Sequence, residues 1–459
     1  MPSTATTRPS HSRRKSRIAQ GLEGPSGEAG GGLAGWAAAS VTGLYANSWR
    51  RDGAKPSRGG AIPLKHAGMS RAPLPVIDPV ELCRDLIRRP SVTPADAGAM
   101  DVLEEVLTRL GFVCRRMRFE DIENLYARRG TTAPNLCFAG HTDVVPVGAD
   151  AQWSVGPFDG EVRDGVLFGR GAVDMKGGIA AWVAAVSRVL AQGEPQGSLS
   201  LLITGDEEGP ALHGTKRVVE QLLAEGERID ACVVGEPSSA QLLGDMIKVG
   251  RRGSLNTWIT VRGRQGHVAY PDRAANPAPV LARLLATLDA HVLDEGYEAF
   301  QPSNLEITTI DIGNTATNVI PAEARARLNI RFNPAHTGVG LMQWLDGVAR
   351  EAEAASGLSI SLEHQCSGEA FLTQSGSFVG AVQDAVEAVA GRRPEASTTG
   401  GTSDARFIRQ LCPVLELGLV GQTMHQIDER VPTAELLELT DIYRRVIETA
   451  PSRLGVLGG

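Results

Sequence analysis

Residues 135–147 read NLCFAGHTDVVPV, an apolar run that passes directly into a His-Thr-Asp triplet. A short apolar run of this kind predicts a buried β-strand. Because side chains alternate along an extended chain, His141 and Asp143 point to the same side and Thr142 to the other. A histidine that offers one ring nitrogen to a metal needs its other nitrogen held, and a nearby carboxylate is a common holder. By itself the triplet fits a polar turn at a strand end as well as a metal site.

Three later segments repeat the pattern of an apolar run that ends in acidic residues. They read VLFGRGAVD, SLSLLITGDEE and IDACVVGE, and the acidic residues at their ends are Asp174, Asp206, Glu207, Glu208 and Glu236. In open α/β sheets, ligands bind in the crevice beyond the carboxyl ends of the strands. So many carboxylates beside His141 would repel one another unless a multivalent cation lay between them. The sequence therefore predicts a metal site at this edge of the sheet.

The types and spacing of these residues suggest a division of roles. Glu207 and Glu208 are adjacent and cannot point the same way from an extended backbone, so one can bind a metal while the other transfers protons. The two oxygens of Asp174 can bridge a pair of ions ~3.5–4 Å apart, a spacing that suits metal-assisted hydrolysis. Mixed histidine and carboxylate ligation favours zinc, with cobalt or manganese as replacements. His425, in the polar loop GQTMHQIDER, is the candidate for a further ligand, although a lone histidine is more often a surface or packed side chain.

Ten motifs together resemble the dizinc aminoacylase and carboxypeptidase family. They are GHTDVVPVG, GRGAVDMKGG, TGDEEG, VVGEPS, RRGS, GRQGHVAYP, TNVIP, SGEAFLT, TTGGTSDARFI and MHQIDERV, spread over residues 74–454. The metal motifs are common to the family. GRQGHVAYP, TNVIP and STTGGTSDARFI indicate a member that hydrolyses the amide bond of N-succinyl-diaminopimelate. The same motifs leave open a sister enzyme that acts on acetylornithine or another N-acylated amino acid, and a non-catalytic binding protein of the same fold.

The resemblance implies a ligand set for two zinc ions per subunit, with cobalt as a substitute. The first ion would be held by His141, Asp174 and Glu236, and the second by Asp174, Glu208 and His425. Glu207 would be the general base that takes a proton from the attacking water and delivers it to the leaving amine. Asp143 would orient His141 from behind.

The resemblance also implies substrate-binding residues. Those expected to bind substrate carboxylates are Arg251, Arg331, Thr402 and the amides of Gly400 and Gly401, and those expected to reach the site from a partner subunit are His267, Tyr270 and Asn318. The planar fork of arginine matches a carboxylate bidentately, and the substrate carries three carboxylates. His267, in a glycine-rich turn, could donate to a developing oxyanion or merely cap the turn. Ser403 lies in no GxSxG elbow, so we reject a serine nucleophile.

Composition restricts the class of protein. The chain has 459 residues, room for two domains, and a net charge of −7, which argues against a nucleic-acid partner. It has no run of eighteen apolar residues, so we expect no membrane span. The six cysteines are scattered without a CxxC pair, which indicates reduced thiols in a cytoplasmic protein.

The periodicity of the sequence predicts the organisation of the fold. Strands and helices alternate up to Gly250, which predicts an α/β sheet of mixed direction, and the order after Gly253 is β-α-β-β-α-β, which is ferredoxin-like. We therefore expect a mixed-sheet dizinc catalytic domain made of residues 74–252 and 366–455. A ferredoxin-like α+β lid domain, residues 253–365, is inserted in it and offers a surface for a homodimer.

Residues 1–73 are Gly-rich and basic, without a helical or strand period, so we predict that they are disordered. An export signal fits them poorly, because the apolar stretch is far from the Arg13-Arg14 pair. Met69 lies just before the recognisable domain, which favours a start codon placed upstream in error over a functional tail.

A protein that begins at Met69 should therefore fold, dimerise and hydrolyse substrate like the full chain. Thermal unfolding, size-exclusion chromatography and an amide-hydrolysis assay would compare the two forms. A large drop in melting temperature on truncation would show that the removed residues pack against the rest.

Overall fold

The computed structural model describes residues 74–454. The predicted disordered extension, residues 1–73, lies outside the described residues, as do residues 455–459.

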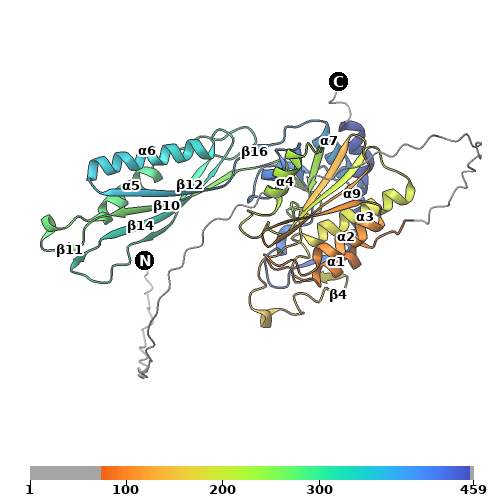
Figure 1. Cartoon of the computed structure of the whole chain (residues 1–459), viewed down its shortest axis with the longest axis horizontal. Coiled ribbons are helices and arrows are strands. Elements are labelled where there is room, and N and C mark those ends of the chain that lie inside the picture. The colour runs from red at the N-terminus through yellow and green to blue at the C-terminus, as the bar shows by residue number, and fades with distance from the viewer. Residues whose placement is uncertain (1–73, 455–459) are drawn as a thin grey trace, which may run out of the picture. The chain divides into compact units, whose positions relative to one another are not determined.

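A mixed sheet of eight strands, in the order β1-β2-β6-β3-β7-β18-β8-β17, forms the larger body of the fold (Figure 1). Its strands are β1 (Val113–Phe119), β2 (Ile122–Arg129), β3 (Asn135–His141), β6 (Ser198–Thr204), β7 (Ala231–Val234), β8 (Met246–Lys248), β17 (Glu395–Ser397) and β18 (Val414–Glu416). Neighbours among β6, β3, β7 and β18 pair in parallel, whereas β1, β2 and β6 pair antiparallel. The carboxyl ends of β6, β3 and β7 therefore lie at one edge of the sheet, as predicted.

Helices cover both faces of this sheet. Those on one face are α1 (Pro79–Ile87), α2 (Ala99–Arg109), α3 (Lys176–Gln192), α7 (Ser377–Ala390) and α9 (Thr433–Leu454), and those on the other are α4 (Thr215–Ala224) and α8 (Ala405–Ile408). Strand β3 shows why both faces are apolar. Leu136 and Phe138 belong to the cluster on the first face, and Cys137 and Ala139 to the cluster on the second. A continuously apolar strand is what a sheet covered on both faces requires.

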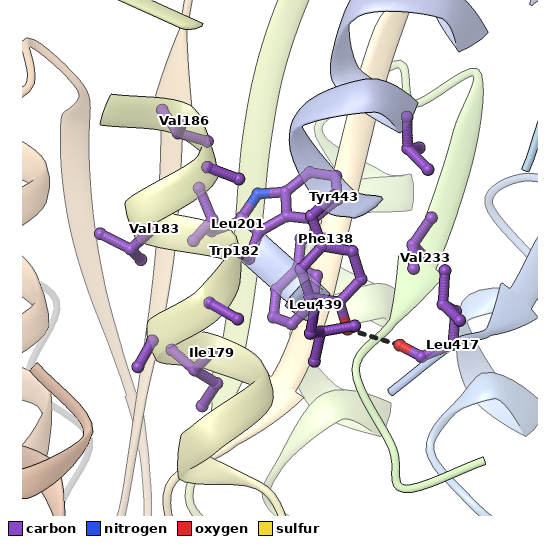
Figure 2. Packing of buried hydrophobic residues seen from close by; sticks show 14 of the residues in the cluster. Phe138, Ile179, Trp182, Val183, Val186, Leu201, Val233, Leu417, Leu439 and Tyr443 are labelled. Carbon is purple, nitrogen blue, oxygen red and sulfur yellow. Dashed lines mark hydrogen bonds between the residues drawn. The ribbon is translucent and has the colours of Figure 1, made fainter. Parts of the chain in front are cut away.

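Three aromatic rings occupy the centre of the first face (Figure 2). Phe138 of β3 stacks on Trp182 of α3 with ring centroids 4.9 Å apart, and Tyr443 of α9 meets Trp182 edge-on at 5.2 Å. The Tyr443 hydroxyl donates to the carbonyl oxygen of Leu417, just after β18. This cluster joins α3 and α9 to the sheet immediately behind the edge where the acidic residues lie.

A sheet of four strands, in the order β12-β14-β10-β15, forms the smaller body. Its elements are β10 (Gly253–Arg262), α5 (Pro277–Asp289), β12 (Asn304–Asp311), β14 (Glu323–Phe332), α6 (Gly338–Ser356) and β15 (Ser359–Gly368). All its neighbouring strands are antiparallel, and α5 and α6 share one apolar cluster with the sheet. The ferredoxin-like order predicted from the sequence is confirmed. The predicted domain limits at residues 252/253 and 365/366 stay a prediction, and β15 itself continues to Gly368.

The remaining elements are short. They are β4 (Glu161–Arg163), β5 (Val166–Phe168), β9 (Gly250–Arg251), β11 (Gly266–His267), β13 (Val319–Ile320), β16 (Phe371–Leu372), β19 (Arg430–Pro432) and the 3-10 turns η1 (Asp150–Gln152), η2 (Pro271–Arg273) and η3 (Gly421–Thr423). Helices α1 and α5 begin where Asp78 and Asn276 accept hydrogen bonds from the first turn, each followed by proline. Within residues 74–454, no helix has the length and apolar character needed to cross a bilayer.

Trp182 is fully buried, and its ring nitrogen has no hydrogen-bond partner among the described residues. Trp182→Ala should therefore lower the free energy of unfolding by about 3–5 kcal/mol, the usual range for removing a buried aromatic side chain. Trp182→Phe should lower it less, because it keeps a ring against Phe138 and loses no hydrogen bond. Urea unfolding followed by far-UV circular dichroism measures both. Trp258, which is 37% exposed, supplies the control, and equal losses for Trp258→Ala and Trp182→Ala would contradict the prediction.

Candidate metal centre and active site

The strand ends bring the predicted metal ligands together. His141 is the last residue of β3, Glu208 follows β6, and Glu236 follows β7. Asp174 comes two residues before α3, and His425 lies in the loop between η3 and β19. Parallel pairing of β3 with both β6 and β7 places three of these side chains on neighbouring strands.

Asp174 lies between the two histidines. Its Oδ1 is 3.2 Å from Nε2 of His141, and its Oδ2 is 3.3 Å from Nε2 of His425. Glu236 Oε1 is 3.7 Å from His141 Nε2, and Glu208 Oε1 is 2.8 Å from His425 Nε2. The five groups therefore form two sets that share Asp174, the same grouping that the family resemblance implies for the metal ligands.

The carboxylates make this a strongly cation-attracting site. Burial alone would lower the pKa of His141, but its hydrogen bond to Asp174 and the charge of Glu236 raise that pKa well above the usual value. Hydrogen bonds to Asp174 and Glu208 raise the pKa of His425 to about 10. Two imidazole nitrogens and three carboxylates are donors that suit zinc or cobalt, and the carboxylates would favour a divalent ion at this place. The residues fit a pair of metal ions.

Glu207 faces the same cavity as the ligands and lies near His141 and Glu236, with one ligand atom of each within 4.8 Å of the others. Burial, and then the charge of the neighbouring Asp404, raise the pKa of Glu207 to about 8. A carboxylate with a pKa near the working pH is suited to accept and return a proton. Asp404 is 5% exposed and was not singled out in the sequence, where it reads as one of many acidic residues.

Asp143 acts on its surroundings differently from the expectation. Nδ1 of His141 is held by the backbone carbonyl of Asp143 at 2.9 Å, whereas the Asp143 carboxylate is 3.7 Å away. That carboxylate instead accepts hydrogen bonds from the backbone amides of Glu207 at 3.2 Å and Glu208 at 3.0 Å. Asp143 therefore holds both strand ends, since its carbonyl orients the imidazole and its carboxylate fixes the two glutamates.

A cavity of about 540 Å³ opens beside the ligands. The sequence-predicted residues that line it are Asp174, Glu207, Glu208, Glu236, Arg251, Gly400, Gly401, Thr402 and His425. The guanidinium of Arg251 donates through Nε and Nη2 to the buried carboxylate of Glu416, and through Nη1 to the carbonyl oxygen of Thr399. A guanidinium has five N–H donors, so two remain for a ligand.

Gly400 is required beside this guanidinium. Its φ is +106°, and a Cβ at this position would lie 2.3 Å from Nη1 of Arg251. Ser403 donates its hydroxyl hydrogen to Glu416 and is 2% exposed, which agrees with rejecting it as a nucleophile.

Lys248 is a cavity residue that the sequence did not indicate. Its Nζ bonds the hydroxyl of Thr399 at 2.8 Å, and no carboxylate among residues 74–454 lies within ion-pair distance of it. Burial and the nearby Arg251 lower its pKa. The one signal that could have singled it out is its place inside the strand-like run DMIKVG, because buried lysines are rare.

Four predicted substrate-binding residues do not line this cavity: His267, Tyr270, Asn318 and Arg331. His267 and Asn318 lie side by side where β11 pairs with β13, since the amide of Val268 donates to the carbonyl oxygen of Asn318. The rings of His267 and Tyr270 are 5.7 Å apart. Nδ1 of His267 accepts from the amide of Ala269, which leaves its exposed Nε2 as a donor.

Comparison with known proteins identifies the family. Residues 137–449 match Peptidase family M20/M25/M40. The chain belongs to this family. The succinyl-diaminopimelate desuccinylase of Caulobacter vibrioides is 66% identical over 380 residues, which are 82% of this chain and 97% of that protein. The desuccinylase of Parvibaculum lavamentivorans is 56% identical over 381 residues, 82% of this chain and 96% of that protein.

Solved structures share the fold at low identity. The metallo-carboxypeptidase Sso-CP2 of Sulfolobus solfataricus superposes with a TM-score of 0.69 at 16% identity, over 82% of this chain and 99% of that one. The YXEP protein of Bacillus subtilis, described as a dinuclear metal-binding peptidase, gives 0.62 at 16% identity, over 81% and 96%. The predicted family and fold class are thus confirmed, and the chain is a metallohydrolase of this family.

The adjacent glutamates allow a matched test of their roles. Glu207→Gln should leave the metal content near wild type and lower kcat by ~10²–10⁴-fold, because it removes a proton acceptor and no ligand. Glu208→Gln should instead lower the metal content, because Glu208 is expected to bind the same metal ion as His425. Elemental analysis and steady-state kinetics measure both, and wild-type turnover by Glu207→Gln would exclude Glu207 as the base.

Proposed function

We propose that this protein hydrolyses the amide bond of N-succinyl-LL-2,6-diaminopimelate to succinate and LL-2,6-diaminopimelate, a step in diaminopimelate and lysine biosynthesis. The desuccinylases that it resembles at 56–66% identity support this substrate. The observation that carries the proposal is the shared cavity, where four of the five metal ligands meet Glu207 and two cations, Arg251 and Lys248. A hydrolytic centre beside cations suits an amide flanked by carboxylates.

We propose two Zn²⁺ ions per subunit, replaceable by Co²⁺. His141, Asp174 and Glu236 would hold one ion, and Asp174, Glu208 and His425 the other. When bound, the ions supply Lewis-acid activation of water and of the scissile carbonyl.

Glu207 performs the proton transfers in this proposal. Its carboxylate accepts a proton from the attacking water and delivers it to the nitrogen of the leaving amine. The Asp143 carboxylate fixes the amide of Glu207, so the backbone that carries the base is held while the proton moves.

Substrate carboxylates bind to the cations of the cavity wall. Arg251 presents its two remaining N–H groups in a plane set by Glu416, and the amides of Gly400 and Gly401 with the hydroxyl of Thr402 line the same wall. Lys248 adds a further positive charge.

Arg331 is a second anion-binding candidate, away from this cavity wall. Burial, and then the charge of Arg252, lower its pKa. Neither arginine has an ion-pair partner among the described residues, so a substrate carboxylate would relieve their repulsion.

We further propose that the protein is a cytoplasmic homodimer. All six cysteines lie among the described residues and are unpaired, as a reducing compartment requires. Strand β12 is an edge strand, and the exposed side chains of Ile310 within it and Ile312 just after it give an apolar edge that a second copy can cover. His267, Tyr270 and Asn318 would then serve the partner's cavity, with Nε2 of His267 donating to the developing oxyanion.

An assay on metal-stripped protein titrated with Zn²⁺ or Co²⁺ tests the activity. Succinyl-diaminopimelate hydrolysis should appear with added metal and exceed acetylornithine hydrolysis. Faster turnover of acetylornithine would assign the chain to a sister activity, and metal binding without hydrolysis of either would favour a binding protein.

Mixed dimers test the sharing of the active site. In a heterodimer of Glu207→Gln and His267→Ala subunits, one site carries both defects and the other neither. Activity should therefore recover toward half of wild type per heterodimer. The contribution at stake is typically ~10²–10³ in kcat for an oxyanion donor. Verified subunit exchange without recovery would show that His267 acts in its own subunit or not at all.

A further inference from the structure

A buried ion pair lies directly behind the metal centre. Arg170, in the loop between β5 and α3, is 2% exposed, and Glu429, just before β19, is fully buried. Nη1 of Arg170 donates to Oε2 of Glu429 at 2.7 Å. Neither residue lines the cavity, and neither is among the predicted site residues.

Four further contacts of the pair go to the backbone at or beside two metal ligands, while Nη2 of Arg170 also donates to the carbonyl oxygen of Pro146 at 3.4 Å and the guanidinium lies 5.3 Å from the Trp153 ring. Oε1 of Glu429 accepts from the amides of Val173 at 2.9 Å and Asp174 at 3.1 Å. Nη1 of Arg170 donates to the carbonyl oxygen of Gln426 at 3.2 Å, and Nη2 to that of His425 at 3.4 Å. The pair therefore ties the backbone of the bridging aspartate to that of the second histidine.

The loop that carries His425 needs such support. His425 has a φ of +62° and Asp428 a φ of +56°, the left-handed region that non-glycine residues rarely adopt. Residues in this region stay there only when the surrounding structure holds them. Arg170 holds two carbonyl oxygens in this loop, at His425 itself and at Gln426.

Stability alone does not explain a buried pair here, because apolar replacement of a buried ion pair is often neutral or stabilising. We propose that Arg170 and Glu429 are positioning residues that set the spacing of Asp174 and His425. They thereby set the affinity of the metal site formed by Asp174, Glu208 and His425. This inference rests on the two-metal centre of the proposed function and is independent of the substrate.

Replacing Arg170 with lysine keeps the charge but removes the fork, since one ammonium cannot reach Glu429 and both carbonyl oxygens. Arg128→Lys is the matched control, because Arg128 of β2 also pairs with a glutamate, Glu227 in the loop after α4, and neither residue lines the cavity. Metal-stripped proteins would be titrated with Co²⁺, with binding followed by calorimetry and by visible absorption. Arg170→Lys should weaken one of the two Co²⁺ ions by ~10–100-fold, the usual effect of losing a partner behind a ligand. Arg128→Lys should leave both unchanged.

A double-mutant cycle identifies the affected site. His425→Ala should weaken the same ion, and adding Arg170→Lys to it should weaken that ion little further, because both changes act through His425. Glu429→Gln is the second variant. It keeps an acceptor for the amides of Val173 and Asp174 but faces Arg170 with a donor, so it should weaken the same ion.

Each other outcome overturns one statement. Wild-type protein that binds fewer than two ions contradicts the proposed metal centre. Wild-type protein that binds two, with unchanged binding in Arg170→Lys, overturns the positioning role. Equal loss of both ions together with a lower melting temperature of the metal-free variants would show that the pair only stabilises the fold.

Discussion

The central constraint on this structure is the mutual repulsion of the carboxylates that gather at one edge of the large sheet. Asp174, Glu208 and Glu236 approach two histidines within 3.7 Å at one edge, and burial withholds the water that would screen them. Such a cluster is costly unless cations occupy it. The raised pKa values of both imidazoles have the same cause, because the neighbouring carboxylates favour positive charge at this place, and a divalent ion would supply that charge.

A second group of buried carboxylates does not line the cavity. These carboxylates accept hydrogen bonds that hold the loops around it. Asp143 accepts from the amides of Glu207 and Glu208, and Glu429 from those of Val173 and Asp174. Glu416 does the same for a side chain, because it holds Arg251 in one plane. Loops after strands have unpaired amides, and a buried carboxylate satisfies two of them at once. The ligands can therefore repel one another without spreading apart.

Whether the sequence could predict a contact in this site depends on how far apart its two residues lie along the chain. The ligands are the first polar residues after apolar strands, and parallel strands end at a common edge, so local patterns place them. The partners of the holding carboxylates are not local. Glu429 is 255 positions from Asp174, and Glu416 is 165 from Arg251. A period of two or 3.6 residues carries no information on such pairs. Asp143 shows a finer limit, because the spacing predicted its approach to His141 but not that its carbonyl would hold the ring.

The connection between the two bodies passes through Arg251, a residue of the cavity wall. The chain leaves the larger sheet through β9 and returns through β16, and these two strands pair, with Arg251 opposite Phe371. Arg251 is thus both a cavity residue and part of the connection between the two bodies. Its guanidinium is fixed by Glu416 of β18, while its backbone belongs to the connecting strands. A carboxylate bound by Arg251 would therefore contact the one cavity side chain whose backbone continues directly into β10. The proposed carboxylate site at Arg251 and the residues carried by the insertion, His267 among them, are therefore joined by a single stretch of backbone.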